Sequence, residues 1–147
     1  MMNAFLRAFV MGALVFAIST PLAAKTAEEI SKERSVVMKK MDSAMNEISQ
    51  RVGGLFAFDK KVIRQKAETI RDIAIDLKTF FPKGSTTSET LPEIWTDAEG
   101  FEKKIRKNVA KAEKLLGELD AADKDQVKKL YKGIHFACTG CHSGYRK

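Results

Sequence analysis

The sequence is poor in cysteine, and it lacks strand-like alternation, internal repeats and low-complexity tracts. Both of its two cysteines lie in the segment "CTGCH" near the end of the 147 residues. One close pair cannot join distant parts of the chain, so the sequence is not that of a disulfide-stapled scaffold. Without strands or repeats, helical patterns are the only regular elements expected, and the sequence predicts an all-α fold.

The chain also lacks an apolar run long enough to span a membrane. Its longest run, from Ala8 to Ile18, is shorter than the ~20 residues that a spanning helix needs. The run follows a single early charge, Arg7, and precedes "STPLAAK", where Ala24 is a small residue suited to cleavage. These features predict a secretory signal peptide over residues 1–24, with an uncleaved anchor as the alternative. After cleavage near Ala24, we expect an exported domain over residues 25–147 without stable membrane insertion.

Acidic residues are fewer than basic ones, and the formal net charge is +7 at pH 7. Removing the signal peptide removes only Arg7, which leaves a surplus of six positive charges. The basic residues are spread along the predicted helical faces, which argues against a nucleic-acid-binding protein. The surplus favours a partner protein with an acidic docking surface.

Two helical patterns occupy the first half of the exported domain. Thr26 and Glu29 form the S/T-x-x-E pattern of a capping box at the start of the first helix, and Gly53-Gly54 interrupts it. Apolar residues recur on one side at 3.6-residue spacing, and Arg34 falls among them. The second helix is predicted to begin at Asp59 and to end at Pro82.

Two further helical patterns follow the loop "PKGSTTSETLPEIW". Thr96 and Glu99 form a second S/T-x-x-E pattern, which predicts the start of the third helix, and Leu119 is its last inward residue. The fourth helix follows "DAAD" and carries CTGCH near its end. Four such helices, joined mostly by short links, predict one antiparallel four-helix bundle.

The CTGCH motif is compatible with three kinds of site. A thioredoxin-like redox pair needs a strand–helix setting, which this sequence lacks. A zinc site could use His135, Cys138, Cys141 and His142, but one helix cannot place four ligands tetrahedrally around an ion. The third reading is C-x-x-C-H as the attachment site of a c-type haem, and it agrees best with an exported all-α chain.

In the haem reading, Cys138 and Cys141 form thioether links to the porphyrin, and His142 is the proximal iron ligand. All three fall on the apolar stripe of the fourth helix, so the single, covalently bound haem c should point into the bundle. His135 lies at the edge of the same stripe and is expected to be a partly buried packing residue rather than a ligand.

The distal iron ligand must come from elsewhere, and the exported domain has three methionines, all on the first helix. Methionines often fill gaps in a core, so two of the three are expected only to pack. In an antiparallel bundle the first helix begins level with the end of the fourth. On a rise of 1.5 Å per residue, Met38 is then closer in level to His142 than Met41 or Met45 are.

Together with CxxCH, the stretches "ERSVVMKKM", "LPEIWTDAEGF" and "CTGCHSGYRK" resemble the cytochrome c-prime family over nearly all of residues 25–147. The resemblance implies an exported four-helix bundle with haem c attached near the C-terminus. It also implies that Met38, four residues after Arg34, matches the iron-ligating methionine of the low-spin, cytochrome c-556 type branch. Arg34 would then lie near a haem propionate, and Arg146 on the proximal side of the haem.

These observations together predict a periplasmic monohaem electron carrier that is not an enzyme and whose iron is bound by His142 and Met38. The alternative is a five-coordinate cytochrome c-prime that binds nitric oxide or carbon monoxide, with Met38 only packing. The resemblance leaves both a monomer and a homodimer open.

Overall fold

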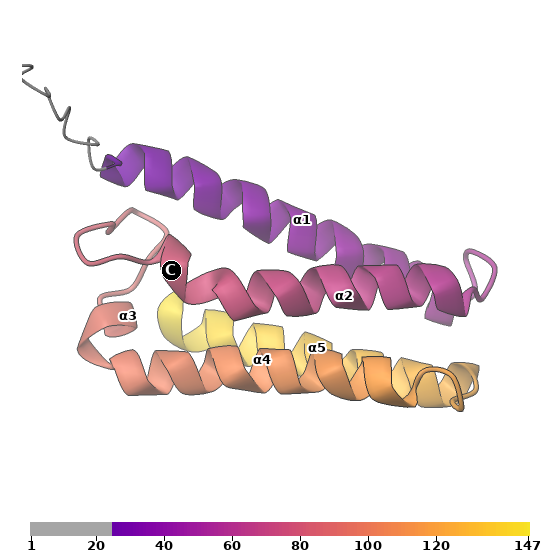
Figure 1. The fold of residues 1–147 in the computed structure, drawn as a ribbon. Coiled ribbons are helices and arrows are strands. Elements are labelled where there is room, and N and C mark those ends of the chain that lie inside the picture. Colours follow the sequence, from indigo (N-terminus) through magenta and orange to yellow (C-terminus); the bar gives the residue numbers. More distant parts are fainter. Residues whose placement is uncertain (1–24) are drawn as a thin grey trace, which may run out of the picture.

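The structure of the protein, a computed structural model, describes residues 25–147, so the predicted signal peptide lies outside the described residues. Four long helices run in alternating directions, and α1 begins where α5 ends (Figure 1). We call this the motif end of the bundle, because α5 carries CTGCH there. The arrangement confirms the predicted all-α antiparallel bundle. The elements are α1 (Ala27–Gly53), α2 (Lys60–Asp76), the 3-10 helix η1 (Leu77–Phe80), α3 (Glu93–Thr96), α4 (Ala98–Glu118) and α5 (Lys124–Tyr145).

The ends of the first two helices follow their local sequence signals. The Thr26 hydroxyl accepts a hydrogen bond from the backbone N–H of Glu29 at 3.2 Å, and the Glu29 carboxylate accepts one from the backbone N–H of Thr26 at 2.7 Å. This reciprocal pair confirms the predicted capping box. Gly54 ends α1 with a φ of 91°, a left-handed conformation that costs glycine little. Asp59 caps α2, also as predicted.

The second predicted capping box is wrong. Thr96 is the last residue of the short helix α3, and its hydroxyl donates to the carbonyl of Pro92 at 3.3 Å. Asp97 caps α4 instead, and its carboxylate accepts from the N–H of Gly100 at 3.1 Å. Because the short helix α3 occupies the end of the predicted loop, the N-cap of α4 is Asp97, one residue after the predicted Thr96.

The end of the second helix differs from the prediction in a way that affects the motif end. Regular α-helix stops at Asp76, the next four residues form η1, and Phe81 lies just beyond it with a φ of −128°. Phe81 therefore leaves the helical path and turns toward α4, where its ring meets the ring of Phe101 edge-on at 5.1 Å between centroids.

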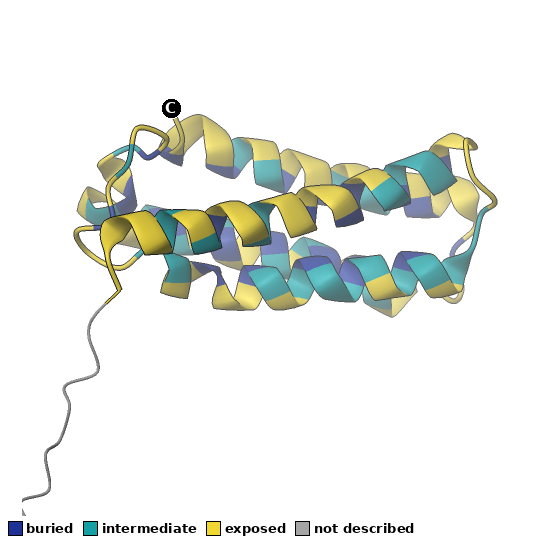
Figure 2. Cartoon of the chain, turned by 90° about the horizontal axis from the view of Figure 1, so that it is seen from above, coloured by how far each residue is buried: buried dark blue, intermediate teal, exposed yellow. Residues whose placement is uncertain are grey.

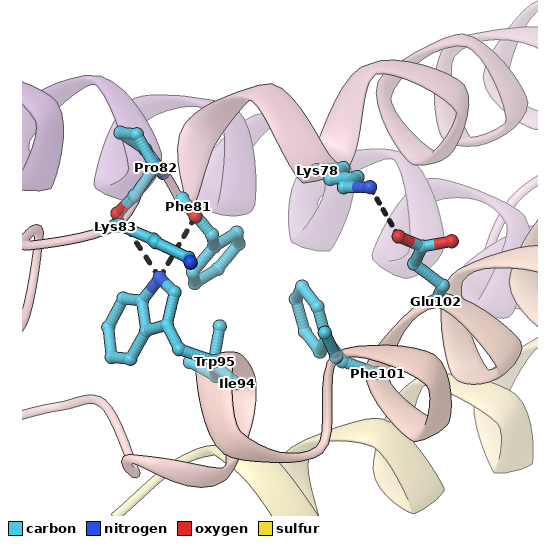
Figure 3. A pocket seen from close by; sticks show the side chains of 9 residues that line it. Lys78, Phe81, Pro82, Lys83, Ile94, Trp95, Phe101 and Glu102 are labelled. Atoms are coloured by element: carbon cyan, nitrogen blue, oxygen red, sulfur yellow. Dashed lines mark hydrogen bonds and ion pairs between the residues drawn. The ribbon is translucent and has the colours of Figure 1, made fainter.

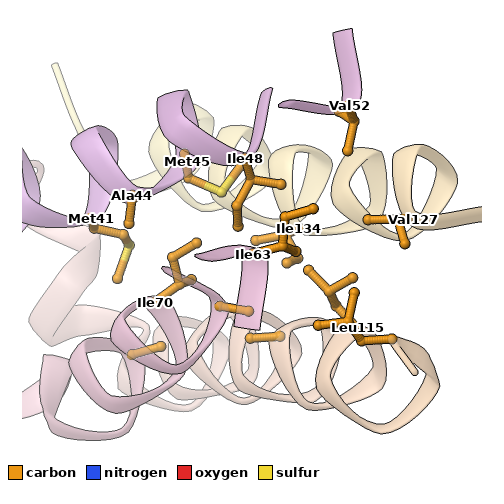
Figure 4. Close-up of a cluster of buried hydrophobic side chains, with 14 of the residues drawn as sticks. Met41, Ala44, Met45, Ile48, Val52, Ile63, Ile70, Leu115, Val127 and Ile134 are labelled. Carbon is orange, nitrogen blue, oxygen red and sulfur yellow. The ribbon is translucent and has the colours of Figure 1, made fainter. Parts of the chain in front are cut away.

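Most of the core lies along the middle and far end of the bundle. Figure 2 shows the buried residues on the facing sides of the helices. The largest fully buried side chains are aliphatic and interdigitate between all four long helices (Figure 4). Within residues 25–147, no helix is long and apolar enough to serve as a membrane span. We call these buried residues the main core: Met41, Ala44, Met45, Ile48, Val52, Ile63, Ala67, Ile70, Ala74, Ala112, Leu115, Leu119, Ala122, Val127 and Ile134.

Candidate functional site

A second apolar cluster fills the motif end of the bundle. It draws residues from η1, α3, α4 and α5 and is separate from the main core. Its aromatic rings pack edge to face, since the Phe101 ring meets both Phe81 and Tyr145 at 5.1 Å between centroids. We call it the motif-end cluster. Its buried members are Leu77, Ile94, Phe101, Ile105, Cys141 and Tyr145, with Met38, Phe80, Phe81 and Trp95 packed against them.

The two cysteines are free thiols that face the inside of the bundle. Cys141 is buried in the motif-end cluster, whereas Cys138 is half-buried at the edge of the main core. The Cys138 thiol donates to the Asn108 side-chain oxygen at 3.3 Å. Burial, and then the neighbouring Cys141, raises the pKa of Cys138 to about 11, and burial also raises the pKa of Cys141. Both side chains are therefore protonated at neutral pH, and both are reduced, as a thioether link to a vinyl group requires, because the sulfur and the hydrogen of a thiol add across the double bond.

His142 is exposed, so the prediction that it lies on the apolar stripe is wrong. One residue turns a helix by about 100°, which takes the histidine from the buried position of Cys141 to the flank of α5. Partial desolvation and then the charge of Arg146 lower the pKa of the imidazole. The ring is therefore mainly neutral at pH 7, and a neutral imidazole nitrogen is the form that binds a metal.

The structure separates the three methionines of α1. Met41 and Met45 are each 8% exposed and belong to the main core (Figure 4). Met38 instead packs against the motif-end cluster, which contains Cys141. The level argument from the sequence favoured Met38, and of the three methionines it is the one that packs at the motif end. Its bond to iron stays a prediction.

Arg34 is the one buried arginine of α1 and is 7% exposed. Its Nη2 donates to the carbonyl of Ser85 at 2.9 Å, and its guanidinium carbon lies 4.6 Å from the centroid of the Phe81 ring. Its buried Nη1 has no hydrogen-bond partner among residues 25–147. Burial lowers the pKa of Arg34, but guanidinium groups remain charged in proteins. The side chain therefore presents a buried, charged donor that needs an acceptor.

Arg146 and His135 lie on the surface. The Arg146 backbone N–H caps α5 by donating to the His142 carbonyl, and its Nη2 pairs with Glu89 at 3.0 Å. His135 is exposed rather than partly buried as expected, and it packs against the rings of Tyr131 and Phe136 at 6.4 and 6.0 Å between centroids. His135 therefore packs against neighbouring rings as expected, but the prediction that it is partly buried is wrong.

A pocket of about 320 Å³ opens beside the motif-end cluster, between η1, α3 and α4 (Figure 3). The Trp95 indole N–H donates to the carbonyls of Phe81 and Pro82 at 3.1 and 3.2 Å, and an ion pair joins Lys78 to Glu102. Its lining contains neither Met38 nor any residue of CTGCH. The pocket is therefore adjacent to the predicted site rather than part of it.

The family model described as Cytochrome C′ matches residues 29–146, which covers most of the chain. The chain belongs to the cytochrome c′ family.

Named relatives and solved structures agree with this assignment. A cytochrome c-556 from Agrobacterium tumefaciens (strain apple 185) is 31% identical over 114 residues, which cover 77% of this chain and 90% of the relative. A cytochrome c′ from Alcaligenes xylosoxydans xylosoxydans is 27% identical, with 82% and 94% covered. A solved cytochrome c′ structure superposes with a TM-score of 0.78 at 26% identity, covering 85% of this chain and all of the solved chain. The family thus includes relatives of both names.

Cytochrome c′ proteins carry one covalently attached haem c with iron and are periplasmic. The residues of this chain fit such a group. Two reduced thiols stand at C-x-x-C spacing, and a neutral, accessible imidazole follows them. The unpartnered Nη1 of Arg34 also fits, because a buried guanidinium donor is suited to a carboxylate such as a haem propionate.

Sequence reasoning missed two polar partners at the motif end. Ser85 accepts from Arg34 through its backbone carbonyl, and any residue type could supply that group, so no sequence signal marks it. Asn108 is 4% exposed and lies between Ile105 and Ala112 on the inward face of α4. A buried amide on an apolar stripe needs a partner, so this position could have been recognised from its spacing.

Proposed function

We propose that this member of the cytochrome c′ family is a periplasmic electron carrier rather than an enzyme. It is exported with cleavage near Ala24 and transfers single electrons through one low-spin haem c. Cys138 and Cys141 attach the haem by thioether bonds, and His142 and Met38 bind the iron. Its partner is a redox protein with an acidic docking surface.

The observation that carries the proposal is the position of Met38. Of the three methionines in residues 25–147, it is the one that packs at the motif end with Cys141. Arg34, one helical turn before it, contacts the Phe81 ring of the motif-end cluster, and its buried Nη1 has no hydrogen-bond partner within residues 25–147. A thioether and a cationic donor on one face of α1 match the needs of an iron and a haem carboxylate, respectively.

The haem supplies the redox chemistry, because its iron alternates between the ferric and ferrous states. The chain supplies position and environment. Cys138 and Cys141 would attach the group to α5, and neutral His142 and Met38 would bind its iron. Arg34 offsets the charge of a carboxylate, and the apolar motif-end cluster excludes water. Thioether sulfur favours the ferrous state, so the reduction potential should exceed that of a bis-histidine haem.

A second candidate function is supported by the relatives. Several solved structures of variants of cytochrome c′ from Alcaligenes xylosoxidans are described as nitric oxide complexes, one with a TM-score of 0.78 and 26% identity to this chain. In that reading Met38 would only pack, and the distal side would be open to nitric oxide or carbon monoxide.

The test is the visible spectrum of the purified holoprotein, oxidised and reduced, before and after adding carbon monoxide. We expect low-spin bands in both states, a weak far-red sulfur-to-iron band when oxidised and little response to carbon monoxide. Met38→Leu should convert the spectrum to high spin and admit carbon monoxide. Met41→Leu is the matched control, because it is the same volume-conserving change in the main core.

The two candidates give opposite results. High-spin bands and ready carbon monoxide binding in the unmodified protein would reject Met38 as a ligand and support the gas-binding reading. A low-spin spectrum that survives Met38→Leu but is lost in Met41→Leu would assign the ligand to Met41 instead.

A further inference from the structure

Six lysines that are distant in the sequence gather on the side of the bundle formed by α4 and α5. The basic residues were expected to be spread along the helical faces, but the packing of α4 against α5 brings these six together. None of the six forms an ion pair within residues 25–147, whereas Lys78, Arg106 and Lys114 all pair with glutamates. We call these six lysines the basic face: Lys103, Lys104, Lys107 and Lys111 from α4, and Lys129 and Lys132 from α5.

Two glycines of α5 lie opposite two lysines of α4 along this face. A Cβ added to Gly133 would lie 3.5 Å from the Lys111 side chain, and one added to Gly140 would lie 3.9 Å from the Lys104 ammonium. The two glycines are seven residues apart, as are the two lysines, so the helices align over two turns. Lys129 lies one turn before Gly133, and therefore on the same side of α5.

A groove of about 500 Å³ runs along this side to the motif end. Asp97, Gly100, Lys103, Lys104, Lys107 and Tyr145 line it. Its inner end lies close to the haem-attachment motif, since Gly140 directly precedes Cys141 and the Tyr145 ring belongs to the motif-end cluster. Lys103, Lys104 and Lys107 therefore lie beside the motif end, in which Cys141 is buried.

An exposed aromatic ring lies within this charged surface. Phe136 is 69% exposed and, at three residues from Gly133 and four from Gly140, lies on the same side of α5. Lys132 is one turn before it. Protein interfaces commonly combine a central apolar contact with a charged rim. An exposed phenylalanine among unpaired lysines therefore has the composition of a docking site for a protein with an apolar centre and an acidic rim.

We propose that the basic face and Phe136 together form the docking surface for an acidic redox protein. The inference rests on the proposed function and identifies the surface that the redox partner contacts. One electron passes from the reduced cytochrome to the oxidised metal centre or flavin of the partner, and no bond forms or breaks. Charge complementarity brings the partner to the α4–α5 side of the bundle, and Phe136 provides the apolar contact.

The test compares charge reversals of equal size at two places. The double variant Lys107→Glu/Lys132→Glu changes the basic face, and Lys39→Glu/Lys61→Glu makes the same charge change on exposed positions of α1 and α2. The reduced holoproteins are mixed with hexacyanoferrate(III), a small anionic oxidant, and with oxidised plastocyanin, an acidic copper protein. At about 0.1 M ionic strength the screening length is about 10 Å, so nearby charges dominate the rates.

We expect the basic-face variant to react about fivefold or more slowly with both oxidants, with a weaker dependence on ionic strength. The α1–α2 variant should stay within about twofold of the unmodified protein. Phe136→Ala should slow the reaction with plastocyanin and weaken its binding, measured by calorimetry, while leaving the hexacyanoferrate(III) rate unchanged. All three variants should keep the visible spectrum, because the changed side chains are exposed and are neither predicted haem ligands nor members of the motif-end cluster.

Equal rates for the two double variants would overturn the docking surface while leaving the proposed function intact, provided that the spectra are low-spin. A high-spin spectrum in the unmodified protein would instead reject the proposed function. If the basic-face variant loses binding to phosphatidylglycerol vesicles but reacts normally with both oxidants, the face contacts membranes and the proposal fails. It also fails if Phe136→Ala dissociates a homodimer while the rates stay unchanged.

Discussion

Replacing Arg34 by methionine tests whether a carboxylate lies against its free Nη1, because the sign of the stability change depends on that acceptor. The substitution keeps an unbranched side chain of similar length and removes the charge. It removes the bond to the Ser85 carbonyl, about 1.5–3 kcal/mol for a charged donor, and the contact with Phe81, up to about 2 kcal/mol when desolvated. It also relieves the desolvation of a buried cation, which costs several kcal/mol.

Without an anion, the loss of the contacts with Ser85 and Phe81 is offset by the relief of desolvation. Arg34→Met should then leave the free energy of unfolding nearly unchanged or raise it. With a haem carboxylate against Nη1, the substitution breaks a buried ion pair and should lower the free energy of unfolding by about 3–5 kcal/mol. We expect the second result in the holoprotein. The haem is covalently attached, so it is present in the folded and the unfolded states alike.

The assay is guanidinium unfolding of the holoprotein followed by far-ultraviolet circular dichroism. Arg51→Met is the matched control, since Arg51 pairs with Glu47 at 2.7 Å near the far end of α1. That half-buried pair within one helix should contribute only about 1 kcal/mol. An Arg34→Met holoprotein as stable as the unmodified one would refute the reasoning and leave Nη1 without an anionic partner.

Three further predictions concern the scaffold. Ile134→Ala, at a position with no exposed surface, should lower the free energy of unfolding in urea by about 2–5 kcal/mol. Gly54→Ala should lower the free energy of unfolding by about 1–2 kcal/mol because Gly54 has a positive φ. Gly53→Ala should be neutral or raise it by up to about 1 kcal/mol. Similar losses of stability in both variants would contradict the left-handed conformation of Gly54 at the end of α1. Burial and donation to Asp97 at 2.8 Å raise the pKa of Tyr145 to about 12, so Tyr145 contributes stability below about pH 10 that is lost as the pH rises toward 12. Tyr145→Phe should remove this loss of stability at alkaline pH, measured by unfolding experiments from pH 9 to 12. An unchanged dependence of stability on pH would show that the hydrogen bond from Tyr145 to Asp97 does not stabilise the fold.

The sequence predicted those parts of the molecule that depend on local signals and on periodicity. Thr26 with Glu29, Asp59, and Gly53-Gly54 define helix ends through bonds within a few residues, and the apolar spacing defines the bundle. Met38 was chosen as the methionine closest in level to His142. That choice needed only the rise per residue of an α-helix and an antiparallel arrangement of the first and last helices, and the fold has both. What was predicted about its bond to iron stays a prediction.

The rest depends on contacts between segments far apart in the chain. The cap at Asp97 follows from a turn of helix, α3, that the loop sequence did not indicate. His142 shares an apolar pattern with its neighbours, but its own angular position takes it to the surface. The basic face arises because α4 and α5 lie side by side, which no reading of either helix alone could show.

The last residues of α5 are tied to the loop before α3 by backbone hydrogen bonds. Leu91 donates to the Tyr145 carbonyl at 3.2 Å, Lys147 donates to the Glu89 carbonyl at 3.1 Å, and Thr90 and Arg146 form an isolated β-bridge. Helix ends usually fray independently of distant loops, but here the two segments can open only together. Amide hydrogen exchange at Leu91 and Lys147 should therefore report one shared opening event, and the backbone beside His142 is steadied by a loop that lies more than fifty residues earlier in the chain.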